Sequence, residues 1–153
     1  MTTLVVLHVL ATAVWVGGTV ALVFTAVPTL RQLPNEQRAA SVRVLGRRWK
    51  PIGWVALLVL GGTGAGLAFG YWNASDPEVL FHSRFGHLLI AKAILFLLLL
   101  VSVYLHDVVL GPRLNRQIRE NRPQTYRRPM VIVGWTSFVI TVTLPILGVV
   151  LTR

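Results

Sequence analysis

Long apolar stretches alternate with short polar stretches along this chain. Four stretches are almost purely apolar, and each has about the 20 residues that a helix needs to cross a bilayer; they are residues 4–27, 52–71, 87–110 and 130–151. Apolar positions are continuous within each stretch, whereas strands of a membrane barrel alternate apolar and polar side chains. The pattern predicts an all-α integral membrane protein, a single domain whose four transmembrane helices form a four-helix bundle.

The composition agrees with a membrane protein. Hydrophobic residues make up 54% of the 153 residues and charged residues only 13%, about half the share that soluble domains carry. The chain contains no cysteine, which excludes disulfides, thiolate metal sites and cysteine nucleophiles.

The positive charges lie mainly in two connections, at residues 28–51 and 111–129. Each connection has six Lys or Arg residues, whereas the connection between the second and third spans has only Arg84. Because cytoplasmic loops carry the excess of positive charge, both basic connections are expected in the cytoplasm and both termini outside. We therefore expect a multi-pass protein of the inner cell membrane. This topology and contact with anionic lipid explain the net charge of +10, so nucleic acid is not expected as a partner.

Two histidines are expected at the same depth in the membrane. His8 lies about one turn into the first span and His87 at the outer start of the third, and these two spans run in the same direction. Ionisable residues inside spans are costly and therefore candidates for function. Two imidazoles at one depth on different helices suit a shared metal ion or a haem iron, and His82 in the outer connection is a third candidate ligand. The alternative is that each histidine is only an interfacial residue.

Three further ionisable residues lie in the third span. Lys92 either extends to the outer surface or, like Arg84, neutralises an acidic group such as a haem propionate or an acidic substrate. His106 and Asp107 lie near the cytoplasmic end, where no second histidine matches their depth. They are expected to bind arginines of the inner connection or to mark the water boundary.

Small and aromatic residues complete the candidate site. Trp15 lies on the same face of the first span as His8, and Gly62 and Gly66 in the second span share one helix face. Small residues at this spacing let another surface approach the helix backbone closely. That surface is either a neighbouring helix or a flat porphyrin.

Short motifs in three of the spans resemble one known family. The sequence His8-x6-Trp15-Val-Gly-Gly resembles the opening of the copper-resistance D (CopD-like) membrane family. Gly62-Thr63-Gly64 and the segment Ser83-Arg-Phe-Gly-His-Leu-Leu-Ile-Ala-Lys92 are similar to that family's later motifs. HemJ-like protoporphyrinogen oxidases are a related family of small four-helix membrane proteins. The resemblance implies that His8 is a haem ligand and that Lys92 is functionally important.

Three functions remain open from the sequence. The first is a redox protein that binds b-type haem near the outer face through His8 and His87. It would act as an electron-transfer subunit or an oxidoreductase. Its candidate partners are a quinone, a porphyrin or another membrane redox subunit. The second is a copper uptake or homeostasis protein with an outer copper site formed by His8, His82 and His87. The third is a non-catalytic subunit of a larger complex, and a homo-oligomer is also compatible with the sequence. Haem is preferred to copper because Cu(I) paths favour sulfur ligands, and the only methionines are Met1 and Met130.

Overall fold

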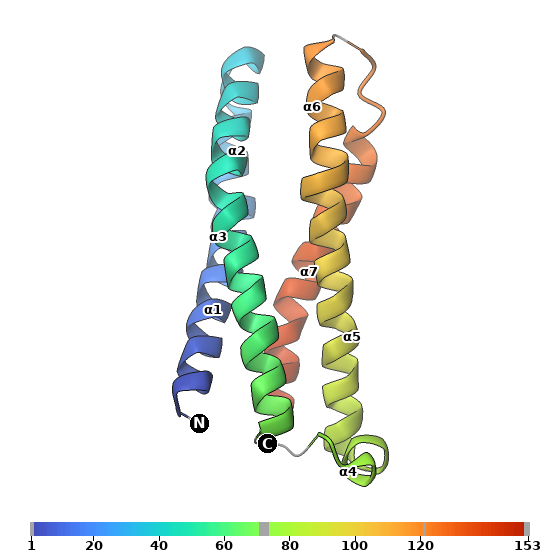
Figure 1. Cartoon of the computed structure of the whole chain (residues 1–153). Helices are drawn as coiled ribbons and strands as arrows, with labels where there is room; N and C mark the ends of the chain where they lie inside the picture. Colours follow the sequence, from blue (N-terminus) through green and yellow to red (C-terminus); the bar gives the residue numbers. More distant parts are fainter. Residues whose placement is uncertain (1, 71–73, 121, 152–153) are drawn as a thin grey trace. The chain divides into compact units, whose positions relative to one another are not determined.

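The protein consists of helices arranged as two compact units. The computed structural model describes residues 2–70, 74–120 and 122–151, and these ranges contain no strand. Unit 1 comprises Met1–Ala74 and unit 2 comprises Ser75–Arg153. Each unit is a hairpin of two long helical arms that run in opposite directions (Figure 1). The predicted all-α class is confirmed.

The first arm of unit 1 is one long helix with a wider turn inside it. It comprises α1 (Thr2–Ala21), the π-helical segment η1 (Leu22–Ala26) and α2 (Val27–Arg31). The amide of Val27 donates to the carbonyl of Leu22, five residues earlier. Pro28 follows directly and has no N–H to donate, so the regular hydrogen-bond ladder cannot continue unchanged there. The π turn lets the helix continue past the proline.

The second arm of unit 1 is α3 (Asn35–Gly70), a single helix of 36 residues. It includes most of the basic connection that the sequence places at residues 28–51. Pro51 lies inside this helix and leaves one backbone carbonyl without its usual donor, but the helix continues on both sides. The basic segment is thus helical, and it continues the second apolar stretch.

Unit 2 begins with a short helix that is capped at its start. Helix α4 (Pro77–His82) follows Asp76, whose side chain accepts from the amide of Glu78 at 2.9 Å. Helix α5 (Arg84–Tyr104) follows Ser83, whose hydroxyl accepts from the amide of Gly86 at 2.9 Å. Side-chain acceptors at these positions satisfy amides that the first turn of a helix leaves unpaired. The cap at Ser83 lies at the corner between α4 and α5.

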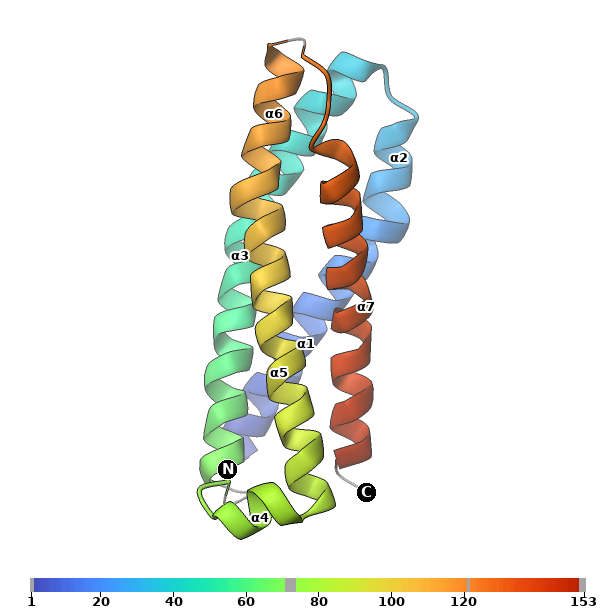
Figure 2. The same ribbon diagram turned by 90° about the vertical axis from the view of Figure 1, so that its right-hand side faces the viewer.

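The long arms of unit 2 repeat the plan of unit 1. Helix α5 continues through the π-helical segment η2 (Leu105–Leu110) into α6 (Gly111–Arg119), and Pro112 lies two residues after the end of the wider turn. The returning arm is α7 (Arg127–Leu151), which packs along α5 (Figure 2). Leu99 and Thr141, one on each helix, are both 1% exposed. Both helices thus contribute fully buried side chains to the protein interior.

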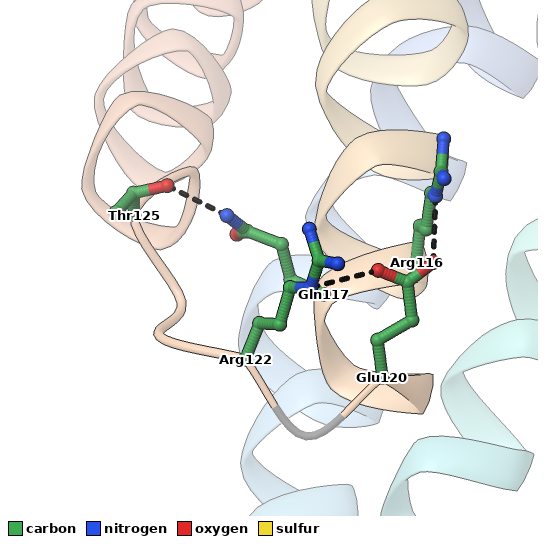
Figure 3. A network of polar contacts seen from close by, with 5 residues as sticks. All are labelled: Arg116, Gln117, Glu120, Arg122 and Thr125. Carbon is green, nitrogen blue, oxygen red and sulfur yellow. Dashed lines mark hydrogen bonds and ion pairs between the residues drawn. The ribbon is translucent and has the colours of Figure 1, made fainter.

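A polar network closes the turn between α6 and α7 (Figure 3). Glu120 accepts from Nε of Arg116 at 2.7 Å and from Nε of Arg122 at 3.1 Å. The side-chain amide of Gln117 donates to Oγ1 of Thr125 at 2.7 Å, and so links the end of α6 to the residues before α7. One carboxylate thus pairs with two arginines of this basic connection.

The surface of the arms is that of a membrane protein. Four helical stretches are long and apolar enough to cross a bilayer: Thr2–Arg31, Gln37–Gly70, Arg84–Ile118 and Arg127–Val150. Large apolar side chains point outward along them, for example Leu58 at 70% and Ile132 at 65% exposure. Such exposure is compatible with lipid around the helices and is costly in water. The protein is therefore a multi-pass membrane protein, as the sequence predicts.

Candidate functional site

The candidate ligand His8 is held by a hydroxyl of the facing helix. His8 lies on α1, half-buried, and its Nδ1 is 2.8 Å from Oγ1 of Thr63 on α3. Thr63 is 6% exposed, and its hydroxyl also donates to the carbonyl of Val59 at 2.6 Å. The imidazole is thus fixed at one nitrogen by a buried polar group, 55 residues away in sequence.

Glycines of α3 make room for side chains of α1 beside this hydrogen bond. A Cβ atom at Gly64 would lie 3.5 Å from Cε1 of His8, and one at Gly66 would lie 3.4 Å from Cδ1 of Leu4. These two glycines therefore serve close packing of the two helices. A Cβ at Gly62 would meet nothing within 4 Å, so Gly62 faces open space. The sequence predicted that Gly62 and Gly66 face either a helix or a porphyrin, and Gly66 packs against Leu4 of helix α1.

Trp15 is part of an aromatic stack that the sequence did not reveal. It is 6% exposed and stacks on Trp49 of α3, with ring centroids 6.3 Å apart and ring planes inclined by 26°. Gly18 on α1 and Gly53 on α3 provide the space for these rings. Trp49 belongs to the basic connection at residues 28–51, and only the facing register of α1 and α3 brings it to Trp15.

Three of the predicted site residues lie at the start of the first long arm of unit 2. His82 ends α4, Arg84 begins α5 and His87 lies in the first turn of α5. All three side chains are exposed. His82 and His87 therefore present imidazoles at the surface, in contrast to the half-buried His8. The predicted pairing of His8 with His87 links unit 1 to unit 2 and stays a prediction.

Lys92 lies farther along α5 and points toward α7. A Cβ at Gly148 would lie 3.2 Å from Nζ of Lys92, so the absence of a side chain there leaves space for the ammonium group. Lys92 is half-buried, and among the residues that the structure describes its ammonium has no hydrogen bond or ion pair. The positive charge is carried inside a predicted span.

The structure pairs His106 with its neighbour Asp107. Nδ1 of His106 lies 2.8 Å from Oδ1 of Asp107, within the π-helical segment η2. The opposite edge of the ring faces α7, where a Cβ at Gly134 would lie 3.7 Å from its Cδ2 and Nε2 atoms. The sequence suggested arginines of the inner connection as partners of these two residues, and did not foresee the bond between them.

No cluster of three or more histidine, aspartate or glutamate side chains suitable for a metal ion occurs in residues 2–70, 74–120 and 122–151. Within unit 1, His8 is the imidazole that the described part of the chain offers to a metal. A single imidazole alone makes a weak metal site.

Comparison with known proteins identifies the family. The family model for copper resistance protein D (CopD) matches residues 42–151. The match includes the fourth span, which the sequence motifs left out, and it begins after the first-span motif around His8 and Trp15. No curated protein and no solved structure matches the chain. Since the family model covers well over half of the sequence, the chain belongs to the copper resistance protein D family.

Proposed function

We propose that this protein is a membrane copper protein that acts in copper uptake or homeostasis and binds a copper ion in transit through His8. The observation that carries the proposal is the match to the copper resistance protein D family over residues 42–151. The hydrogen bond between His8 and buried Thr63 supports His8 as the ligand, because metal-binding histidines are typically held at their second nitrogen.

The chemistry of the available ligands favours Cu(II) at this position. Imidazole nitrogen binds Cu(II) well, whereas thiolate and thioether sulfur select Cu(I). The chain has no cysteine, and Met1 and Met130 are its only methionines. A path lined by sulfur is therefore not available within this chain.

Charge also favours unit 1 for the ion. The apolar stretches of unit 1 contain no Asp, Glu, Lys or Arg and only one histidine, His8, whereas α5 of unit 2 carries Lys92. Two unit charges about 4 Å apart repel by about 4 kcal/mol at an effective dielectric constant of about 20, and a divalent ion doubles this cost. A copper ion next to Lys92 is thus unfavourable, and Lys92 is better suited to an anionic group.

Haem, the first preference from the sequence, receives no support from the family match or from the described contacts. A b-type haem needs one or two axial ligands and a flat apolar slot. Gly66, one of the glycines expected to line such a slot, instead packs against Leu4. Copper is therefore the better assignment, and a visible spectrum separates the two.

The test is copper uptake by the full-length protein in proteoliposomes, with Cu(II) as the probe and elemental analysis as the measurement. The protein is purified through a tag without histidine, so that the tag contributes no ligand. His8→Ala should abolish most of the uptake, whereas the matched control His106→Ala should retain it. Uptake by His8→Ala equal to that of the parent protein would contradict the role of His8. A Soret band in the purified parent protein, with no copper uptake, would replace the proposal by haem binding.

A further inference from the structure

The imidazole ring of His8 has two nitrogens, and only one of them offers a lone pair when the ring is neutral. The hydrogen bond made by one nitrogen decides which tautomer is present, and thus which nitrogen can bind a metal. In His8, Nδ1 lies 2.8 Å from Oγ1 of Thr63. The direction of this hydrogen bond therefore determines the chemistry of the ring.

The proton of the Thr63 hydroxyl is already used within α3. A hydroxyl has one proton and two lone pairs. Oγ1 of Thr63 donates to the carbonyl of Val59 at 2.6 Å, and the carbonyl of Leu60, at 3.4 Å, is its weaker alternative. In both cases the proton points to the backbone of the same helix. Oγ1 thus presents a lone pair to His8, and Nδ1 of His8 must be the donor.

Thr63 is well placed to hold this orientation. Its side chain is 6% exposed, and threonine in a helix has few accessible rotamers because it is branched at Cβ. The neighbouring Gly64 leaves the imidazole enough room, since a Cβ there would be 3.5 Å from Cε1 of His8. Both the hydrogen-bond acceptor and the space for the ring come from adjacent residues of α3.

We propose that Thr63 is a positioning residue that fixes His8 as the Nδ1–H tautomer, so that copper binds at Nε2. The copper part of this inference rests on the function proposed above, whereas the tautomer does not. Loss of a partner that orients a ligating histidine typically lowers metal affinity about 10- to 100-fold. We expect a loss of that size when the hydroxyl of Thr63 is removed.

The tautomer is measured directly by ¹⁵N NMR of histidine-labelled protein without copper. The full-length protein carries His82→Ala, His87→Ala and His106→Ala, so that His8 is its only histidine. In this background Nδ1 should show the shift of a protonated nitrogen and Nε2 that of an unprotonated one. Thr63→Val removes the hydroxyl at nearly constant shape and should give a mixture of tautomers, whereas Thr63→Ser should retain the original spectrum.

Copper affinity is measured separately, by Cu(II) titration followed by electron paramagnetic resonance, in protein with all four histidines. Thr63→Val should weaken the component that depends on His8 by about 10- to 100-fold, and Thr63→Ser should restore most of it. Thr12→Val is the matched control. The hydroxyl of Thr12 donates to the backbone carbonyl of His8 at 2.8 Å, whereas that of Thr63 lies at the imidazole ring. This control should leave the affinity close to the parent value.

The outcomes separate this inference from the proposed function. An Nε2–H tautomer of His8, or equal copper affinity in Thr63→Val and the parent protein, would overturn the role of Thr63. If the parent protein shows the expected tautomer but binds no copper at His8, the copper function is contradicted, and so is the metal at Nε2. The tautomer of His8 would still agree with the role of Thr63.

Discussion

The adjacent glycines Gly17 and Gly18 allow a sharp test of how α1 packs on α3. A Cβ atom at Gly18 would overlap the outer ring atoms of Trp49, whereas a Cβ at Gly17 would meet nothing within 4 Å. The two positions lie in the same helix and differ mainly in the direction they face. Gly17→Ala is therefore the matched control for Gly18→Ala.

The expected difference follows from the surroundings of Trp49. Its ring cannot move away freely, because it stacks on Trp15, and a Cβ at Gly53 would lie only 3.0 Å from Cζ3 of Trp15. Added methyl groups in a tightly packed contact typically cost about 1–3 kcal/mol. Both substitutions gain up to about 1 kcal/mol from replacing glycine by alanine inside a helix. Gly18→Ala should therefore be less stable than Gly17→Ala by about 1–3 kcal/mol.

The free energy of unfolding is measured in detergent micelles by titration with sodium dodecyl sulfate, with circular dichroism as the signal. A second comparison repeats Gly18→Ala in a Trp49→Leu background. There the substitution should cost much less, because the indole that occupies the space is gone. Equal stability of Gly17→Ala and Gly18→Ala, or the same cost of Gly18→Ala with and without Trp49, would refute the close contact between Gly18 and Trp49.

Two further predictions concern sidedness and the corner between α4 and α5. Because the chain has no cysteine, single cysteines introduced at the exposed positions Gln37, Gln124 and Glu78 report topology without background labelling. An impermeant thiol reagent added to intact cells should label position 78 alone. Labelling at positions 37 and 124 instead would show the opposite orientation. Gly86→Ala should disrupt the corner, since a Cβ there would collide with the backbone carbonyls of Leu80 and Val79. Gly62→Ala should be tolerated, because its Cβ meets open space. Thermal unfolding compares the two variants, and an unchanged melting temperature of Gly86→Ala would contradict the packing of that corner.

Much of the fold could be predicted from the sequence because membrane spans are determined by local properties. Continuous apolar runs of sufficient length allow few structures other than a helix in lipid. Over the residues that the structure describes, all four predicted stretches lie within long helices. The helix ends were less predictable. Helix α3 begins at Asn35 and passes Pro51, because a proline removes one hydrogen bond but need not end a long helix. The π turns before Pro28 and Pro112 likewise let a helix continue past a proline, and the prolines themselves mark these places in the sequence.

The candidate site could be predicted only in part. His8 was recognisable because an imidazole inside an apolar span is costly. Its partner Thr63 was not, since the contact depends on how two helices, 55 residues apart in sequence, are rotated toward each other. The same holds for the stack of Trp15 on Trp49. The bond between His106 and Asp107 was missed for another reason: the wider turn of η2 gives adjacent residues an orientation that regular helical spacing does not predict.

The division into two hairpins has a consequence for biosynthesis. Each hairpin finds its packing partner within its own half of the sequence, so the α1–α3 contact can form as soon as Gly70 has left the ribosome. At translation rates of about 5–20 residues per second, the second half follows on the order of ten seconds later. During that interval the first hairpin can pair, so that His8 can meet Thr63 before α7 is complete.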